Sequence, residues 1–465
     1  MKLHILGAAH TVTGSEYLIE VNGRRLLLEC GLFQGRRSDT YEKNLNFGYN
    51  PKTVDAMILS HAHIDHSGNL PNLVKNGFNA PIYATPATVE LADIMLQDSA
   101  HVQEMDVAFV NKKRSQRREP LVEPLYTVQD AIDVRPLFVK KNYNESFTPI
   151  PGVRAKLVDA GHILGSASVC LDVEENGRSY RFWFSGDIGR YQLPLLKDPT
   201  LPQDVDYLLM ESTYGDKVHG DPEVAFREFR DVVKRTVARG GKVIVPAFAV
   251  GRTQELVYAL NRMITSGELP AIPVFVDSPL AVRATDVFKE FADDFDEETR
   301  AFVLSGKHPA LTFKTLTYIQ SVDESKALNE RSDPMVIISA SGMAEAGRIL
   351  HHLRNNIENP RNTIAIVSWQ APDTLGRRLA DREPHVRIFG EKFTRRAEVA
   401  TIGGLSAHAD QALLMRYAQA SNGRLKKLIV VHGEPRSSGV LIEKLRPALP
   451  ETEIIYPIQD EMVDI

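Results

Sequence analysis

Four side chains of the metal-binding type lie within six positions of the chain, in His61-Ala-His63-Ile-Asp65-His66. The apolar run DAMILS before them predicts a strand, and SGNLPNLVKNG after them predicts a helix. In extended backbone, residues two apart project to the same side, so His61 and His63 can grip one metal ion while the turn directs Asp65 and His66 towards a second. A buried polar cluster of this kind is costly unless a cation pairs with it. The segment therefore predicts a metal site rather than a purely structural cluster.

One such loop cannot complete two metal sites, so further ligands should stand at other strand ends. His162 follows the predicted strand RAKLVDA, and Asp187 follows the predicted strand RFWFS. A glycine precedes each of them and allows the tight turn that a ligand beside a metal needs. Gly-His and Gly-Asp pairs are common in turns, so each signal alone is weak. Together with the histidine cluster they predict a two-metal site.

The elements that would hold these residues begin as short strands. Up to about residue 210, apolar alternation and glycine-rich turns follow one another quickly, as in LHILG, EYLIEV and RRLLLECG. Helical patterns interrupt them at 69–76 and 86–105, and the basic, poorly periodic stretch NKKRSQRREP after the second predicts a loop. The sequence therefore predicts a strand-rich first domain with its candidate ligands just beyond the strand ends.

After DYLLMESTYGD the pattern changes. A predicted helix over 221–239 is followed by alternating strands and helices from KVIVPAF to NTIAIVSWQ, which is typical of βαβ units around a parallel sheet. Beyond about residue 387 strand patterns return, with the glycine-rich IGGLSAHAD and the strand LKKLIVVHGE. We therefore expect 1–210 and 388–465 to form one domain, with 211–387 inserted between them as a second.

The composition is that of an ordinary globular protein. Its 465 residues predict two or three packed units, and 43% hydrophobic with 25% charged residues is unlike a disordered chain. The sequence has no apolar run near the roughly 20 residues of a membrane helix, and its start lacks the features of a signal peptide. We therefore expect a cytoplasmic location and no membrane contact. Cys30 and Cys170 lie in apolar stretches and are expected to be buried thiols.

The motifs resemble those of a known family. HAHIDH, His162 and Asp187 resemble the ligands of the metallo-β-lactamase superfamily, and ESTYGD, PAFAVGRTQEL, GLSAHAD and VVHGE resemble its β-CASP branch of nucleic-acid nucleases. The match runs in order over nearly the whole chain and is closest to RNA-processing members, namely the pre-mRNA 3′-end cleavage endonuclease subunit and its bacterial and archaeal relatives. The resemblance implies an α/β fold, with an αββα sandwich, an inserted β-CASP domain and the active site in a cleft between them.

The resemblance also implies a role for each motif residue. It assigns one zinc to His61, His63 and His162, the other to Asp65, His66 and His432, and the bridge between the two Zn²⁺ ions to Asp187. Asp65, Glu211 and His408 are the implied catalytic residues, and Glu29 is similar to a residue that supports the ligand loop. DNA-repair members of the branch tend to have an apolar residue where His432 stands, so the histidine favours RNA.

The chemistry of phosphodiester hydrolysis agrees with these roles. It needs an in-line nucleophile, neutralisation of the phosphate oxygens and protonation of the departing alkoxide. Two zinc ions about 3.5–4 Å apart supply the first two. A neutral histidine cannot donate a proton, so His408 needs a carboxylate such as Glu211 to raise its pKa.

Weaker signals concern substrate contacts. With a net charge of −5 the chain cannot coat nucleic acid by bulk charge, so basic groups that touch RNA must be local. The run 112–118 is either such a group or a solvated loop; its cations are Lys112, Lys113, Arg114, Arg117 and Arg118. A turn between a predicted strand and helix either cradles a phosphate or is an ordinary βα turn; its candidate substrate-binding residues are Ser339, Ser341, Gly342, Arg348 and Arg377. We expect His351 and His352 to lie on a helix surface.

The sequence thus predicts a two-zinc ribonuclease that hydrolyses single-stranded RNA and leaves a 5′-phosphate and a 3′-hydroxyl. The chain ends soon after His432, whereas J-type 5′-exonucleases usually carry a further domain, so an endonuclease is favoured over an exonuclease. A thioester or lactam hydrolase of the same superfamily would have no use for Glu211 or His408. A zinc-free binding module would have lost ligands. A homodimer stays open, and RNA specificity cannot be read from the sequence.

Overall fold

The computed structural model describes residues 1–35, 37–304, 310–371, 373–421 and 423–465. The chain divides into two compact units. Unit 1 comprises Met1–Tyr191, Asp198–Val218 and His408–Ile465, and unit 2 comprises Gln192–Lys197 and His219–Ala407. None of the helices in the described ranges is both long and apolar enough to cross a membrane.

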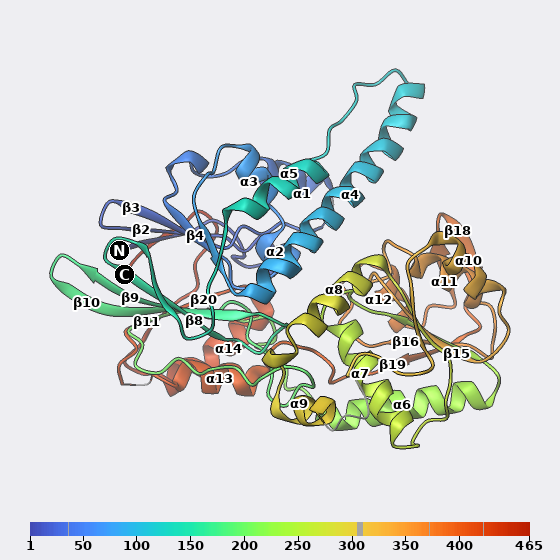
Figure 1. Ribbon diagram of the computed structural model, residues 1–465. Coiled ribbons are helices and arrows are strands. Elements are labelled where there is room, and N and C mark those ends of the chain that lie inside the picture. Colours follow the sequence, from blue (N-terminus) through green and yellow to red (C-terminus); the bar gives the residue numbers. More distant parts are fainter. Residues whose placement is uncertain (36, 305–309, 372, 422) are drawn as a thin grey trace. The chain divides into compact units, whose positions relative to one another are not determined.

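Unit 1 contains two mixed sheets, each of seven strands as far as the chain is described (Figure 1). The first sheet has the strand order β22 (Met462–Asp464), β1 (Lys2–Ile5), β2 (Tyr17–Val21), β3 (Arg24–Leu28), β4 (Ala56–Ile58), β5 (Ile82–Ala84) and β6 (Phe138–Lys140). The second has the order β21 (Glu453–Ile455), β20 (Lys427–Val431), β11 (Tyr207–Glu211), β10 (Arg178–Phe184), β9 (Ala167–Glu175), β8 (Val153–Asp159) and β7 (Ser146–Ile150).

The two sheets of unit 1 pack face to face through the apolar side chains on one face of each sheet. Val169, Leu171 and Val173 of β9 join residues of β1 to β4 in one buried apolar core. The intervening Cys170 points to the opposite face, where it packs with residues of two C-terminal helices. Helices therefore cover the outer faces of the sheets, and the predicted αββα sandwich is confirmed. The helices of unit 1 are α1 (Arg37–Leu45), α2 (Ile64–Ser67), α3 (Leu70–Lys75), α4 (Pro86–Gln116), α5 (Val128–Val134), α13 (Gln411–Gln419) and α14 (Pro435–Ala448).

Strand direction places the candidate ligands at one edge of the sandwich. In the first sheet β3 and β4 are parallel neighbours, and Glu29 and His61 follow their carboxyl ends. In the second sheet β10, β11 and β20 are parallel neighbours, and Asp187, Glu211 and His432 follow those three strands or end them. Side chains distant in sequence thus meet where parallel strands end, the usual place for a site in such sheets.

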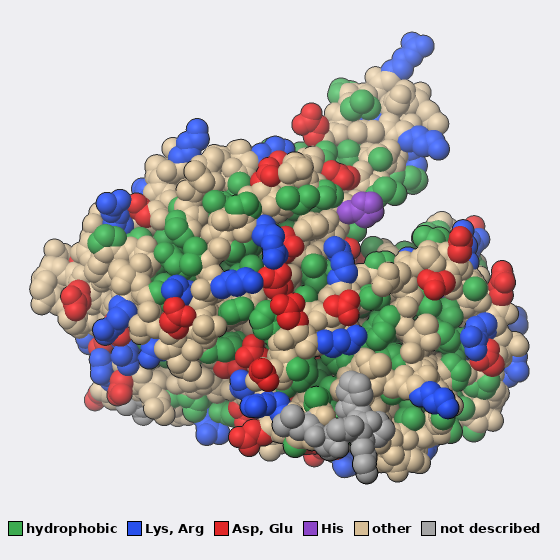
Figure 2. All heavy atoms as spheres, viewed as in Figure 1, with side chains coloured by type: hydrophobic (Ala, Val, Ile, Leu, Met, Phe, Trp, Pro, Cys, Tyr) green, Lys and Arg blue, Asp and Glu red, His purple; other side chains and the backbone are tan. Residues whose placement is uncertain are grey.

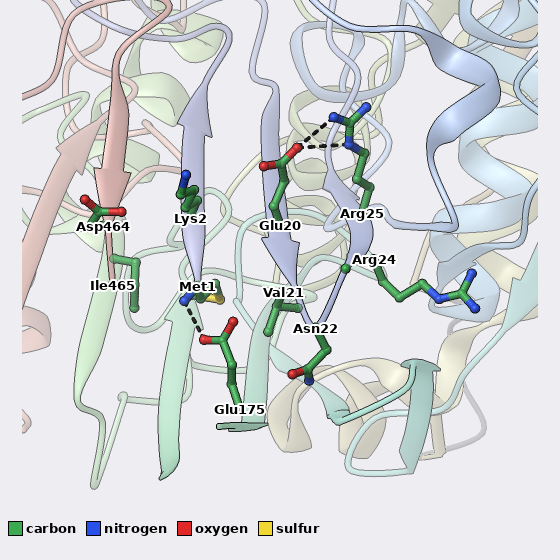
Figure 3. Close-up of a pocket in the computed structure, with 11 residues that line it drawn as sticks. Met1, Lys2, Glu20, Val21, Asn22, Arg24, Arg25, Glu175, Asp464 and Ile465 are labelled. Carbon is green, nitrogen blue, oxygen red and sulfur yellow. Dashed lines mark hydrogen bonds and ion pairs between the residues drawn. The ribbon is translucent and has the colours of Figure 1, made fainter. Parts of the chain in front are cut away.

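A shallow pocket of about 500 Å³ lies beside the two chain ends and contains none of the predicted site residues (Figure 3). The Met1 ammonium is 2.5 Å from Glu175, and Arg25 is 2.8 Å from Glu20. These charges are already paired, so we assign the pocket no ligand. Cys30 and Cys170 are free, buried thiols, as predicted.

Unit 2 is built around a parallel sheet, as the alternation of strands and helices predicts. In the described part of the chain its strand order is β14 (Leu316–Ile319), β13 (Val274–Asp277), β15 (Met335–Ser339), β12 (Lys242–Pro246), β16 (Thr363–Ile366) and β19 (Glu398–Thr401). Strands β17 (His385–Ile388) and β18 (Glu391–Thr394) form a separate antiparallel hairpin, which comes between β16 and β19 in the chain. The helices are α6 (Pro222–Ala238), α7 (Arg252–Thr265), α8 (Pro279–Glu290), α9 (Glu297–Leu304), α10 (Val322–Glu330), α11 (Ile349–Asn356) and α12 (Leu375–Ala380).

One helix end and both domain boundaries differ from the predicted ones. Residues 211–218 belong to unit 1, and residues 192–197 belong to unit 2. Helix α4 continues to Gln116, so the basic residues 112–114 are helical and do not lie in a loop. Residues 388–407 belong to unit 2, because β19 pairs with β16 in the parallel sheet. The return of strand patterns after residue 387 therefore begins with strands of the second unit, and unit 1 resumes at His408.

Candidate metal centre

The loop that carries the histidine cluster is fixed by its own backbone. Strand β4 ends at Ile58, and α2 begins at Ile64 with His63 as its N-cap residue. The Ser67 hydroxyl donates to the carbonyls of Ala62 and His63, which closes the turn from the inside. The four candidate ligands of this segment therefore project from hydrogen-bonded backbone, and His61 and His66 are buried.

Three ring nitrogens and a carboxylate oxygen converge on one point. His63 Nδ1 lies 3.2 Å from His61 Nε2 and 3.1 Å from His162 Nε2. Asp187 Oδ2 lies 3.6 Å from His61 Nε2 and 3.5 Å from His162 Nε2. Tetrahedral zinc with bonds of about 2.0–2.1 Å holds its ligand atoms about 3.3–3.4 Å apart. These spacings fit a four-coordinate cation.

A second group faces the other oxygen of Asp187. Asp187 Oδ1 lies 3.3 Å from His66 Nε2 and 3.5 Å from His432 Nδ1. Asp65 Oδ2 is 3.8 Å from His66 Nε2 and 3.6 Å from His432 Nε2. The two oxygens of one buried carboxylate thus point at two separate clusters of candidate ligands. Asp187 is the residue that the two clusters share.

The tight turns before two of these ligands use the predicted glycines. Gly161 precedes His162 with φ of 66°, and Gly186 precedes Asp187 with φ of 56°. Both angles lie in the left-handed region, which glycine enters without the steric cost of a side chain. Glu29 and His432 also have positive φ, at 63° and 46°, although they are bulky. Such backbone is costly and concentrates at functional sites.

Buried hydrogen bonds to Nδ1 orient the rings of His61 and His66. Glu29 Oε2 accepts from His66 Nδ1 at 2.6 Å and from the Ser60 hydroxyl at 2.8 Å. The Ser60 oxygen is also 2.9 Å from His61 Nδ1, so it can accept from that ring nitrogen. Each contact places a proton on Nδ1 and leaves Nε2 of His61 and His66 free to face a metal. Ser60 was not predicted as a site residue, although it directly precedes the cluster.

Replacing Glu29 by glutamine is expected to weaken metal binding about 10–100-fold, because the amide cannot fix the His66 ring as the carboxylate does. The fold should persist, since glutamine has the same size. Competition with a chromophoric chelator measures the metal affinity, and circular dichroism checks the fold.

The control for this prediction is Glu16→Gln. Glu16 is another buried glutamate of unit 1, and it accepts a hydrogen bond from the Tyr49 hydroxyl at 2.6 Å rather than from a ligand histidine. Its replacement should leave metal affinity unchanged. An equal affinity for Glu29→Gln and the unaltered protein would show that other contacts orient His66.

Glu211 and His408 form a pair next to Asp187. His408 Nδ1 lies 3.4 Å from Glu211 Oε1 and 3.9 Å from Asp187 Oδ2. The buried Glu211 carboxylate also accepts from the Ile188 amide at 2.6 Å, which holds it in place. Burial acts to lower the pKa of His408, but the Glu211 carboxylate, helped by Asp187 and Asp65, raises it to about 9. His408 can therefore hold a proton beside the candidate ligands.

The electrostatics of the clusters favour neutral histidine ligands and bound positive charge. Burial lowers the pKa of His61 and His162 well below the ordinary range, so both are neutral, as metal ligands must be. Burial also opposes a charge on His66, yet the Asp187 and Asp65 carboxylates raise the pKa of His66 well above its ordinary value. The region around Asp187 therefore has a strongly negative potential.

Buried polar atoms without hydrogen bonds also indicate that the two clusters bind cations. Within the described ranges, His66 Nε2, Asp187 Oδ1 and His432 Nε2 are buried and make no hydrogen bond. Buried polar atoms without a partner are rare and costly. A divalent cation at each cluster would satisfy them, so the residues present fit the metal that their types and spacing predict.

The predicted substrate-binding residues lie in unit 2, and Ser339, Arg348 and Arg377 each have a side-chain partner within that unit. The Ser339 hydroxyl donates to the Asp277 carbonyl at 2.7 Å, and Arg348 donates to the Asp277 carboxylate at 2.7 Å. Arg377 forms an ion pair with Asp381 at 2.8 Å. Ser341 and Gly342 form the turn that follows β15. Contact of these residues with a substrate stays a prediction.

The expectation for His352 is wrong. Its side chain is fully buried, and Nε2 lies 2.6 Å from the Asp277 carboxylate. The neighbouring His351 is exposed, as expected for a helix surface. The Asp277 carboxylate of β13 thus contacts both His352 and Arg348. The sequence did not reveal this structural role.

Family models match three consecutive parts of the chain. The metallo-beta-lactamase superfamily matches residues 12–227, the Beta-Casp domain matches 253–379, and the Zn-dependent metallo-hydrolase RNA specificity domain matches 393–457. The αββα sandwich, with clustered histidines and carboxylates at its strand ends, is the architecture of a metal-dependent hydrolase.

Similar proteins span almost the whole chain. Ribonuclease TTHA0252 of Thermus thermophilus is 40% identical over 93% of each chain, and an RNase J-like protein of Methanocaldococcus jannaschii is 30% identical over 93% of this chain and 92% of its own. Transcription termination factor FttA of Pyrococcus abyssi is 30% identical over 93% of this chain and 66% of its own. The chain belongs to the metallo-β-lactamase superfamily and to its β-CASP branch, so the resemblance predicted from the motifs is confirmed.

A solved structure supports the fold alone. A protein of unknown function from Enterococcus faecalis V583 matches with a TM-score of 0.52 at 13% identity, covering 100% of this chain and 99% of its own.

Proposed function

We propose that this chain is a zinc-dependent ribonuclease with two Zn²⁺ ions, which hydrolyses single-stranded RNA endonucleolytically in the cytoplasm and leaves a 5′-phosphate and a 3′-hydroxyl. The observation that carries the proposal is the placement of Asp187. Its two oxygens face two ligand clusters, and the Glu211–His408 pair lies against the same carboxylate. A paired metal site with a proton donor beside it suits phosphodiester hydrolysis.

In this proposal His61, His63 and His162 would hold one ion, Asp65, His66 and His432 would hold the other, and Asp187 would be shared by both groups. Zinc in these positions would supply a nucleophile from water near neutral pH and would neutralise the phosphate.

The chain's own residues supply the rest of the proposed chemistry. Glu29 and Ser60 keep the rings of His66 and His61 in the tautomer that presents Nε2. Glu211 holds the proton on His408 and directs the ring, and His408 delivers that proton to the departing 3′-oxygen. Asp65 Oδ2 lies 3.8 Å from His66 Nε2 and 3.6 Å from His432 Nε2, where it would help to position an attacking water. A substitution at one of these residues removes one role and keeps the others. Variants of metal-binding residues and of His408 should therefore differ in zinc content as well as in rate.

RNA is proposed as the substrate for two reasons. Two of the relatives that align over nearly their full length are named as a ribonuclease and an RNase J-like protein. Glu211 and His408 also form a pair that a thioester hydrolase would not need, because a thiolate departs more readily than an alkoxide. Ser341, Gly342 and Arg377 are proposed to contact the RNA backbone.

The proposal is tested by metal analysis and by labelled RNA. Purified protein should contain about two zinc ions per chain, and chelation should abolish cleavage, with recovery on adding zinc. A 5′-labelled and an internally labelled single-stranded RNA should yield internal fragments before mononucleotides. If mononucleotides appear first, the enzyme is a 5′-exonuclease rather than an endonuclease. If zinc-loaded protein does not cleave RNA, the proposed function is wrong.

A hairpin at the cleavage site should slow cutting. An equal rate on the hairpin and on the unfolded strand would contradict the preference for single strands.

A further inference from the structure

The long helix α4 has a distal part that the metal centre does not explain. Its first half is anchored by buried apolar residues as far as Ala100, and beyond that point Val107 is the buried residue of the helix. Figure 1 shows the distal half, with the chain that returns from its end, projecting away from the sheets of unit 1. We call residues 101–127 the arm.

Hydrogen bonds join the helix of the arm to the segment that returns from its end. Val107 is 7% exposed, and the Asn111 side chain exchanges two hydrogen bonds with the Val122 backbone, at 2.8 and 2.9 Å. Arg114 Nε donates to the Pro120 carbonyl at 2.5 Å. Positions 107, 111 and 114 lie on one side of a helix, where the returning chain packs. The opposite side is therefore left uncovered within unit 1.

That outer face carries a stripe of large apolar residues. Val102 is 44% exposed, Met105 is 60% exposed and Phe109 is 61% exposed. Their spacing of three and four residues places them within about 60° of one another on the helix, on the side away from Val107 and Asn111. Adjoining exposed apolar side chains of this kind mark a contact surface more often than scattered single ones do.

Cations continue the same stripe towards the tip of the arm. Lys113 Nζ lies 4.4 Å from the centre of the Phe109 ring. Arg114 faces Glu119 at 3.8 Å, whereas no ion pair is found in the described ranges for the other four cations of the tip, Lys112, Lys113, Arg117 and Arg118. Figure 2 shows Lys and Arg side chains gathered at this tip. The positive charge is local, since the whole chain has a net charge of −5.

Helix stability alone does not account for these residues. Basic side chains in the last turn interact favourably with the helix dipole, which suffices for Lys113 and Arg114. Arg117 and Arg118 come after the helical residues and gain less from that dipole. The exposed ring of Phe109 gains nothing from it. A ligand that is both anionic and able to stack on an aromatic ring fits all of these features.

We propose that the arm is an RNA-binding surface outside the metal centre, which holds a single-stranded segment flanking the cleavage site. Lys112, Lys113, Arg117 and Arg118 would contact phosphates, and Phe109 would stack on a base, with Met105 and Val102 beside it. Single-stranded RNA combines repeated negative charge with exposed aromatic faces, and proteins bind it with this combination of groups. The proposal rests on the proposed ribonuclease function for its choice of polyanion.

The test compares two variants of equal net charge by fluorescence anisotropy with a labelled single-stranded RNA, in a His408→Ala background that keeps cleavage slow. The arm variant replaces four cations by glutamine: Lys112, Lys113, Arg117 and Arg118. The control variant does the same to four exposed cations of unit 1 outside the arm: Lys2, Arg154, Arg178 and Arg446. The arm variant should lose at least tenfold in affinity at low salt, and the slope of log affinity against log salt should fall by up to about 2.8, or ~0.7 per phosphate contact. The control should stay within about twofold.

The stacking contact is tested by Phe109→Ala and Phe109→Trp. The alanine variant should bind RNA about fivefold more weakly or worse, because loss of one stacked base costs at least that factor. The tryptophan variant should restore binding, since it keeps a ring. Sedimentation of the same variants, with and without RNA, reports on self-association.

Equal losses in the arm and control variants would show that only overall charge matters, and undiminished binding by the arm variant would remove the RNA surface altogether. A changed self-association without a changed RNA affinity would assign the stripe to a second copy of the chain and overturn the proposal. Failure of the ribonuclease function would look different, because RNA would bind without being cut by the zinc-loaded protein. When the same four arm replacements are made in the protein that keeps His408, the cleavage rate of a dinucleotide should be unchanged.

Discussion

Asp187→Ala is expected to abolish cleavage and to lower the zinc content below that of every other single variant at the site. The two oxygens of Asp187 face two ligand clusters, at 3.5–3.6 Å on one side and 3.3–3.5 Å on the other. Its loss removes a ligand from both clusters and leaves two cations close together with less negative charge between them. Rates on labelled RNA and metal analysis of the same preparations measure both effects.

Two further variants make this prediction specific. Asp187→Asn keeps the size of the side chain but removes its charge, so it should retain the fold and still lose zinc. Asp172→Ala removes a partly exposed carboxylate of β9 that pairs with Arg181 instead of a histidine, and it should leave zinc and cleavage intact. Full zinc content with undiminished cleavage in Asp187→Ala would contradict the assignment of Asp187 as the bridge.

The turns that carry the candidate ligands could be predicted because their signals are local. The run before His61 is continuously apolar, as in a buried strand, and the glycines before His162 and Asp187 adopt the left-handed backbone that such turns require. The meeting of these turns depends on strand pairing, which is not local. Strand β11 pairs with β20, more than two hundred positions later in the chain, and that pairing brings His432 beside Asp187. The family resemblance, rather than periodicity, supplied this part of the prediction.

The features that the sequence missed have partners far away in the chain. His352 shares the buried face of α11 with Ile349 and Leu353, so the helical period alone is consistent with its burial. Its polar partner Asp277 stands 75 positions earlier, and no local signal indicates that pairing. The end of α4 was missed because its last residues, 111–116, are all polar or basic and so show no apolar periodicity. Lysine, arginine and glutamine are good helix formers, and they carry the helix on to Gln116 without that periodicity.

The second domain boundary was misplaced for a related reason. Strand patterns after residue 387 look alike whether they belong to one sheet or another. Strand β19 enters the parallel sheet of unit 2 beside β16, with Glu398 opposite Thr363. The ion pairs of Glu398 with Arg235 and Arg239 of the same unit strengthen that placement. Composition changes little at residue 408, where unit 1 resumes, so no local signal marks this boundary.

His408→Ala is expected to slow cleavage about 10²–10⁴-fold, the usual contribution of general acid catalysis, without loss of zinc or fold. His408 Nδ1 is 3.4 Å from Glu211, which keeps the ring protonated, and the ring is partly exposed, as a group that meets substrate must be. A substrate whose bridging 3′-oxygen is replaced by sulfur should restore much of the rate, because a thiolate leaves without needing a proton. Single-turnover rates on the oxygen and sulfur substrates give the ratio for each variant.

The comparison with Asp187→Ala separates proton donation from metal binding. The sulfur substrate should rescue Asp187→Ala far less, since that defect lies in the nucleophile and in neutralisation of the phosphate. Glu211→Gln should resemble His408→Ala in its sulfur effect, because Glu211 acts through the histidine it holds. Repeating the assay with manganese or cadmium controls for the affinity of sulfur for the metal. If His408→Ala gains no more from sulfur than the unaltered protein does, His408 binds or positions the phosphate, and the proton must come from another group.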